Sequence, residues 1–210
     1  MLFGKKHNIL LIKIYIYIKF YVIIDVKSRS KGKNAMENLI IDSLISRRSI
    51  KSYQNKQISN EELDTILKAG SYAASGRNRQ SAIMIAVQDA ETIALLSKMN
   101  AEIMGRDMDP FYGAPTVVIV LADKTVNTHL EDGCLVMGNL MTAAHAIGVD
   151  SCWIHRAKEE FESEAGKELL RKWGIENAEN YVGIGHCLLG YRACDYPKAS
   201  PRKENYIYKV

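Results

Sequence analysis

The chain has 210 residues, of which 47% are hydrophobic and 25% are charged, and its formal net charge is +4. These fractions are typical of a globular protein with a sizeable core and argue against an intrinsically disordered chain. Residues 1–35 hold eight Lys and Arg and one Asp, which leaves 20 basic and 23 acidic residues in 36–210. The larger part is therefore mildly acidic, and we expect it to bind no nucleic acid.

The first 35 residues need an interpretation of their own. Residues 9–24 are apolar apart from Lys13 and Lys19. A membrane span needs about 20 apolar residues and tolerates central lysines poorly, and no cleavage pattern of a secretory signal follows. Of these 35 residues, 21 are of the types that AT-rich codons encode. We expect residues 1–35 to be translated upstream sequence or a non-native extension outside the folded domain. A membrane or interfacial anchor and a poor signal peptide are the alternatives.

Hydrophobic periodicity predicts alternating helices and strands in the remaining chain. Helices are expected over residues 37–46, 59–70, 90–99, 131–147 and 161–173, and buried strands over 81–87, 116–122, 150–154 and 181–189. Ser59 followed by Glu62 is typical of a capping box at a helix start. The helix over 131–147 is apolar around much of its girth, so we expect it to be central. Interleaved helices and strands indicate an α+β or α/β fold with helices covering a central sheet.

Two basic clusters offer fixed cations far apart in the sequence. They comprise Arg47, Arg48, Ser49 and Lys51 after the first predicted helix, and Arg202 and Lys203 near the C-terminus. Guanidinium groups bind phosphate oxygens in pairs and a hydroxyl adds a further donor, so the clusters suit a dianionic phosphate. Taken alone, a basic cluster of this kind more often lies on a solvated surface.

Other patterns are less specific. The four cysteines show no C-x-x-C or His–Cys ligand spacing, so no metal site is predicted. Gly183 and Gly185 resemble a fragment of a dinucleotide-binding loop, but a third glycine and a following acidic residue are missing. The cysteine usage is compatible with a reducing compartment, and we expect a cytoplasmic protein.

Seven segments occur in an order that resembles the nitroreductase family of FMN-dependent oxidoreductases, and the similarity extends from Met36 to Val210. The segments are RRSIKSY at 47–53, AASGRNRQ at 73–80, YGAP at 112–115, GNLMTAA at 138–144, AIGVDSCWI at 146–154, VGIGH at 182–186 and PRK at 201–203. Chains of this family commonly begin just before their Arg-rich motif, which favours Met36 as the native start.

The resemblance implies a three-layer α/β/α fold with a mixed central sheet of four or five strands. It also implies an intertwined homodimer, in which a C-terminal extension adds a strand to the partner's sheet. Residues 36–210 would form this FMN-binding domain.

The resemblance further implies which residues bind FMN. Arg47, Arg48 and Ser49 match the contacts to the phosphate and ribityl chain, and Arg202 and Lys203 match further phosphate contacts. Lys51 matches a basic position near the N1/C2 carbonyl edge of the flavin. A cation there stabilises the negative charge that two-electron reduction places on that edge.

Two other segments match positions around the flavin ring. Asn78 would meet the pyrimidine edge, with Ser75 and Gln80 as neighbours, and the backbone of Ile154 and His155 would lie beside the ring. Asn78 and Gln80 could instead satisfy loop backbone groups, and His155 could be a surface histidine.

This loop also departs from the family pattern. Ala74 replaces a frequent proline, and Ser81-Ala82 replaces Pro-Trp, which changes the expected shape of the substrate pocket. Arg77 and Arg79 flank Asn78 and would favour anionic substrates.

We therefore expect an FMN-containing homodimer that uses NAD(P)H for ping-pong two-electron reduction of nitroaromatics, quinones or similar small-molecule acceptors. The flavin N5 would carry the chemistry, and no side chain need act as a general base. A specialised flavin enzyme of the same fold, dehalogenating or flavin-fragmenting, is one alternative. A non-catalytic flavin-binding redox sensor is another. The physiological acceptor and the choice between NADH and NADPH stay open.

Overall fold

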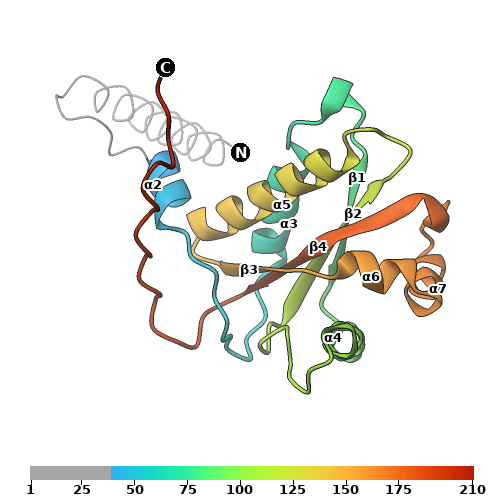
Figure 1. Ribbon diagram of the computed structural model, residues 1–210. Coiled ribbons are helices and arrows are strands. Elements are labelled where there is room, and N and C mark those ends of the chain that lie inside the picture. The colour runs from blue at the N-terminus through green and yellow to red at the C-terminus, as the bar shows by residue number, and fades with distance from the viewer. Residues whose placement is uncertain (1–38) are drawn as a thin grey trace, which may run out of the picture. The chain divides into compact units, whose positions relative to one another are not determined.

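The central strand of the fold, β2 (Thr116–Asp123), is buried along nearly its whole length. The computed structural model describes residues 39–210, so the expected extension 1–35 lies outside the described residues. Strand β2 pairs with β1 (Ala82–Val87) and β4 (Tyr181–Gly190), and β4 pairs with β3 (Asp150–Ile154). The resulting order is β1-β2-β4-β3 (Figure 1). The Val- and Ile-rich sequence of β2 suits a strand that is covered on both faces.

The pairing within the sheet is antiparallel at all three strand contacts. A parallel bridge between Ser49 and Ser151 attaches the segment after the first helix to the edge strand β3, and the Ile50 N–H donates to the Ser151 carbonyl at 3.0 Å. A second bridge, antiparallel, joins Tyr53 to Arg192 beyond the end of β4. Within residues 39–210, the mixed character expected of the sheet is thus confined to the bridge at Ser49.

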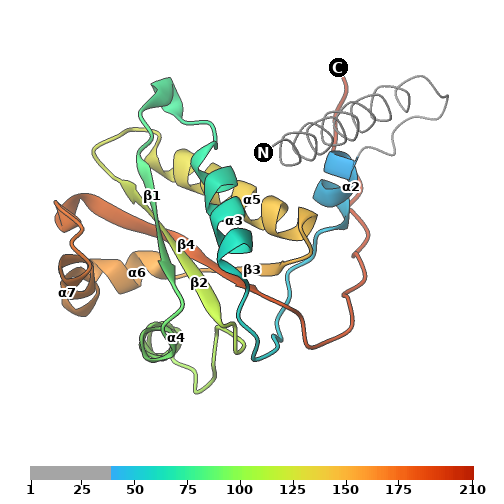
Figure 2. The ribbon, with the colours of Figure 1, turned by 180° about the vertical axis from the view of Figure 1, so that it is seen from behind.

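Helices cover both faces of the sheet (Figures 1 and 2). Helices α3 (Asn60–Ser71) and α5 (His129–Ala146) lie over one face, and α4 (Ala90–Met104), α6 (Ala157–Glu162) and α7 (Glu164–Lys172) lie over the other. Two short 3₁₀ turns, η2 (Gly76–Asn78) and η3 (Ala178–Asn180), complete the connections.

Alternate side chains of β2 enter the two layers, because successive residues of a strand point to opposite faces. Ile119 and Leu121 pack in the core with α4, α6 and α7, whereas Val118 and Val120 pack with α3 and α5. All four side chains are fully buried. The expected three-layer α/β/α arrangement is confirmed.

Most predicted elements form close to their expected bounds. The capping box is present: the Glu62 N–H donates to the Ser59 hydroxyl at 3.2 Å, and the Ser59 N–H donates to the Glu62 carboxylate at 2.7 Å. Strand β3 has its predicted bounds, and the central helix begins two residues earlier than expected, at His129. Each of these elements has a strong local signal in its own sequence.

The single helix predicted over 161–173 is wrong, because the chain breaks into α6 and α7 at Ser163. Ser163 has an extended backbone (φ −71°, ψ 155°), and its hydroxyl accepts from the Gly166 N–H at 3.1 Å. A Cβ at Gly166 would collide with the Glu160 carbonyl oxygen. The serine cap and the close approach at this glycine start a new helix in a new direction.

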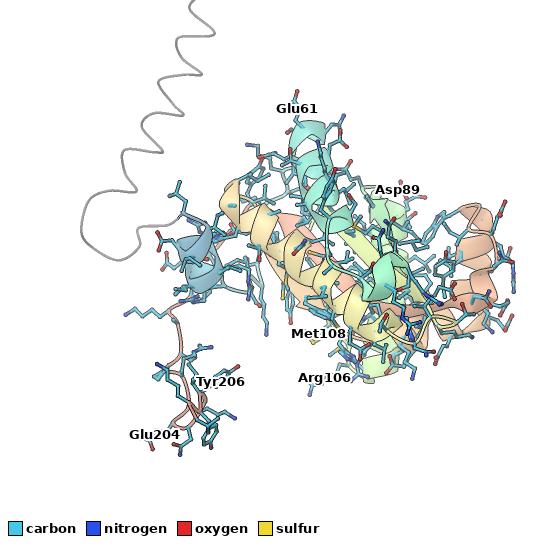
Figure 3. The ribbon with its side chains drawn as sticks, turned by 90° about the horizontal axis from the view of Figure 1, so that it is seen from above. Glu61, Asp89, Arg106, Met108, Glu204 and Tyr206 are labelled. Atoms are coloured by element: carbon cyan, nitrogen blue, oxygen red, sulfur yellow. The ribbon has the colours of Figure 1, made fainter. Side chains whose placement is uncertain are left out.

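The first helix, α2 (Leu39–Ser46), and the tail after Gly190 lie at one end of the sheet and expose apolar side chains. Leu39 is 84% exposed on α2, and Tyr206 is 66% exposed on the tail. Figure 3 shows Glu204 and Tyr206 projecting away from the sheet and its covering helices. Exposed apolar groups of this kind are typical of surfaces that a partner covers. None of the helices within 39–210 is long and apolar enough to cross a membrane.

Two adjacent leucines on α4 test the location of the core. Leu96 is fully buried, whereas Leu95 is 44% exposed. Leu96→Ala should lower the free energy of unfolding by about 2–5 kcal/mol, because it leaves a cavity beside the sheet. Leu95→Ala, a matched control on the same helix, should change it by about 0.5 kcal/mol or less. Urea denaturation measures both values, and equal losses would contradict the layer assignment.

Candidate functional site

The first basic cluster lies where α2 ends and the chain joins the edge strand β3. The Arg48 Nη1 donates to the carbonyl oxygens of Ile45, Ser46 and Arg47, each at 2.8 Å. This guanidinium therefore caps the C-terminus of α2, where carbonyl groups lack helical partners. The bridge between Ser49 and Ser151 then holds the cluster against β3.

Two cationic nitrogens of this cluster are buried without an acceptor. Within residues 39–210, Arg47 Nη1 and Arg48 Nε make no hydrogen bond. An unpaired buried donor is costly, and the cost is greater for a charged group. Anions with several acceptor oxygens are the usual partners of such donors, so the donor set of this cluster fits a phosphate group.

His145 and Tyr196 also contact the segment that carries the first basic cluster. The sequence analysis did not predict either residue as part of the site. The Tyr196 hydroxyl donates to the Ser46 carbonyl at 2.9 Å and accepts from the Arg48 N–H at 3.0 Å. The His145 ring stacks on Tyr196 at 6.0 Å and lies 2.8 Å, Nε2 to Oγ, from Ser46. Burial lowers the pKa of His145, the charges of Arg47 and Arg192 lower it further, and Asp150 opposes them. The ring is therefore neutral at pH 7.

Lys51, Ile154 and His155 lie along the same edge of the sheet. Lys51 is exposed, and its Nζ lies 5.9 Å from the centre of the Tyr112 ring. Ile154 ends β3 and is half-buried, while His155 is exposed. The His155 carbonyl accepts from Asn100 Nδ2 at 2.8 Å, which fixes the backbone at the end of the strand. The first cluster and the end of β3 thus form one continuous edge.

The loop of residues 75–80 contains the next group of predicted residues, and hydrogen bonds within the loop join three of them. Arg77, Asn78 and Gln80 have φ values of 52°, 54° and 50°, in the left-handed region. Ser75 Oγ accepts from the Gln80 N–H at 3.1 Å, and Gln80 Nε2 donates to Asn78 Oδ1 at 3.1 Å. The side chains of Asn78 and Gln80 therefore bind each other.

Asp132 on α5 anchors this loop, and sequence reasoning missed it. Its carboxylate accepts from the Gly76 N–H at 2.9 Å, from Ser81 Oγ at 2.7 Å and from Thr128 Oγ1 at 3.3 Å. Burial alone would raise the pKa of Asp132, but these hydrogen bonds outweigh it and hold the pKa below its ordinary value. The carboxylate is therefore charged at neutral pH.

Helix α5 keeps the loop and the first basic cluster apart. Asp132 near its start contacts Gly76, and His145 near its end contacts Ser46. Thirteen residues of α-helix separate these contacts, which is about 20 Å at 1.5 Å per residue. The structure therefore places Arg47, Arg48, Ser49, Lys51, Ile154 and His155 along one edge of the sheet at β3. It places Ser75, Asn78 and Gln80 near the opposite end of α5.

The second basic cluster lies on the exposed tail. Arg202 Nη2 donates to the Ser200 carbonyl at 2.8 Å, and Lys203 Nζ lies 5.4 Å from the centre of the Tyr206 ring. Among residues 39–210, no hydrogen bond or salt bridge joins either residue to Arg47 or Arg48. Residues 39–210 also contain no group of three or more His, Cys, Asp or Glu side chains that could hold a metal ion.

Comparisons with known protein families and sequences both point to the nitroreductase family. The sequence profile described as "Nitroreductase family" matches residues 44–107 and 102–191. A protein of Archaeoglobus fulgidus, provisionally named an NADH dehydrogenase/NAD(P)H nitroreductase, is 33% identical over 153 residues, which cover 70% of this chain and 82% of that protein.

Solved structures that are similar to this fold are also nitroreductases. A nitroreductase of Bacteroides fragilis with bound FMN has a TM-score of 0.75 and 26% identity, covering 85% of this chain and 100% of that one. A nitroreductase of Desulfitobacterium hafniense with bound FMN has a TM-score of 0.72 and 25% identity, covering 83% and 100%.

The hydrogen bonds to Asp132 predict a pH-dependent contribution to stability. Asp132→Asn should lower the free energy of unfolding at pH 7 by about 1.5–3 kcal/mol, the scale of hydrogen bonds to a charged group. Because the folded pKa is lowered, this difference should be complete above the unfolded pKa of about 4 and should shrink as the pH falls further. Denaturation curves between pH 3 and 7 measure it.

Asp64→Asn is the matched control. Asp64 is exposed on α3, so its substitution should change stability by about 0.5 kcal/mol or less. A wild-type advantage over Asp132→Asn that grows toward pH 3 would contradict the assignment.

Proposed function

The chain belongs to the nitroreductase family of oxidoreductases, and on this basis we propose that it binds FMN and uses NAD(P)H to reduce small-molecule acceptors such as nitroaromatics or quinones. The observation that carries the proposal is the pair of buried, unpartnered cationic nitrogens on Arg47 and Arg48 beside β3. The FMN bound to the solved relatives supports the identity of the cofactor.

The proposed roles of the residues rest on the family resemblance, and their positions along β3 support them. Arg47 and Arg48 would neutralise the phosphate, and Ser49 would add a hydroxyl donor. Arg48 also caps α2, so filling the site would stabilise the end of that helix. Lys51 would place a positive charge at the ring edge, and the end of β3 would lie beside the ring.

FMN, when bound, supplies two-electron hydride chemistry. The protein's own part is then to bind the phosphate, to orient the ring along the edge of β3 and to leave one face open for NAD(P)H and the acceptor in turn. No general base is required of the side chains at this edge.

We propose further that the complete site forms between two copies of the chain. The loop of residues 75–80 lies about 20 Å along α5 from the Arg47 cluster. Tyr196 of the tail bonds to Arg48, but Arg202 and Lys203, further along the tail, form no hydrogen bond or salt bridge with that cluster. The exposed apolar side chains on α2 and the tail give the surface that a homodimer would bury. In such a dimer, the loop of one copy would face the Arg47 cluster of the other.

Arg77 and Arg79 would then lie at the mouth of the composite site. Both side chains are exposed and form no salt bridge within 39–210. Their charges would favour acceptors that carry a carboxylate or another anionic group.

The phosphate contact predicts a specific loss of affinity. Arg47→Ala should weaken FMN binding by about 1.5–3 kcal/mol, because it removes a charge-assisted hydrogen bond. Arg106→Ala removes an exposed arginine outside the proposed site and should leave the affinity unchanged. Fluorescence titration of the apoprotein with FMN measures both. Equal affinities for Arg47→Ala and the wild type would remove this cluster from the site.

The composite site predicts complementation between two defective chains. Arg47→Glu and Asn78→Trp should each abolish FMN binding as homodimers. Coexpressed, they should restore about a quarter of the sites, because half of the dimers would be mixed and each mixed dimer would hold one intact site. The FMN content of the purified mixture measures this.

Coexpression of Arg47→Glu with Lys51→Glu is the matched control. Both changes lie in the same cluster, so no mixed dimer would contain an intact site. A site built from one chain alone would show no restoration in either pair, and that result would overturn the composite arrangement.

A further inference from the structure

Three polar side chains meet in the core layer beneath the end of β3, where the surrounding core residues are apolar. They are Asn100 on α4, Glu160 on α6 and His186 on β4, and each is fully buried. The rings of Phe111 and Phe161 flank His186, with centroids at 5.1 and 6.3 Å. Polar side chains buried in such a place are costly unless they serve one another or the backbone.

The contacts of this group converge on one backbone carbonyl. Asn100 Nδ2 donates to Glu160 Oε1 at 2.6 Å and to the His155 carbonyl at 2.8 Å. Glu160 Oε2 lies 3.0 Å from His186 Nε2, an approach without the direction of a good hydrogen bond. The carboxylate of Glu160 thus fixes the amide of Asn100, and that amide holds His155.

The hydrogen bond from Asn100 to the His155 carbonyl also sets the direction of the next backbone N–H, that of Arg156. Residues 39–210 contain no cis peptide bond, so the His155 carbonyl and the Arg156 N–H point to opposite sides of one planar unit. The carbonyl faces inward to Asn100, and the Arg156 N–H therefore faces away from α4. No acceptor for this N–H lies within the described part of the chain.

The conformation of Arg156 shows that this direction is imposed by its surroundings. Its φ of 77° is in the left-handed region, which a side-chain-bearing residue rarely adopts. The Arg156 carbonyl accepts from the Glu160 N–H at 3.1 Å, so Glu160 binds Arg156 through its backbone and Asn100 through its side chain. Such a conformation persists only where neighbouring contacts determine it.

We propose that Asn100, held by Glu160, is a positioning residue for the oxidoreductase reaction: it turns the His155–Arg156 peptide so that the N–H faces the flavin ring. This inference rests on the proposed function, because it needs FMN beside the end of β3. A fixed N–H donor at the ring favours the uptake of charge during reduction, since it needs no reorientation at that moment.

The test compares two asparagines that each hold a backbone carbonyl. Asn100→Leu removes the amide that holds His155. Asn139→Leu removes an amide that donates to the Ala69 carbonyl at 3.0 Å between α5 and α3. Both variants are prepared as full-length holoprotein, and FMN content, FMN affinity and the rate of flavin reduction by NADH or NADPH are measured.

Asn100→Leu should retain FMN with wild-type affinity, because the phosphate contacts lie elsewhere, and should be reduced about tenfold more slowly, the scale of one lost hydrogen bond. Asn139→Leu should be reduced at the wild-type rate. Should Asn100→Leu not fold, Asn100→Ser makes the same comparison with a smaller change in the core.

A wild-type rate in a folded Asn100 variant would overturn the inference and leave the proposed function intact. The inference would also fail if both asparagine variants slowed equally, or if the Asn100 variant lost FMN, since either result indicates a general structural effect. A wild-type protein that binds no FMN would overturn the proposed function, and the inference with it.

Discussion

The packing of α5 against the sheet fixes where both parts of the candidate site lie. The helix covers the centre of one face, and its buried side chains pack directly on β2 and β4. Asp132 near its start anchors the loop of residues 75–80, and His145 near its end contacts α2 beside the Arg47 cluster. Helix α5 thus separates the two groups of proposed site residues by about 20 Å. In the proposed composite site, a second copy of the chain would bring its loop to the Arg47 cluster of the first.

Charge and burial are distributed differently in these two groups. The Arg47 cluster has buried cationic nitrogens without acceptors, which an anion would satisfy. In the loop, by contrast, the buried charge of Asp132 is already satisfied by three donors. The Arg47 cluster therefore has donors left for a ligand, whereas the buried charge that anchors the loop of residues 75–80 has its hydrogen bonds within the protein. Buried polar groups of both kinds are costly, and they gather at the ends of the sheet where the proposed chemistry lies.

Much of the fold could be predicted from the sequence because its signals are local. The capping box at Ser59 and the apolar run of β2 need only their own neighbours to be recognised. The break at Ser163 was missed because it depends on how closely Gly166 approaches Glu160. Tyr196, Asp132 and Asn100 were missed for a related reason: their partners lie 150, 56 and 60 residues away in the sequence. Contacts at such separations leave no periodic signal.

The central claim is that the edge formed by the Arg47 cluster and β3 holds FMN. Its most direct test is the visible absorption spectrum of the purified protein, followed by mass spectrometry of any cofactor released on heating. We predict a yellow protein with flavin absorption bands that releases FMN, close to one molecule per chain. A colourless protein that takes up no added FMN, or a protein that releases FAD, would contradict the account.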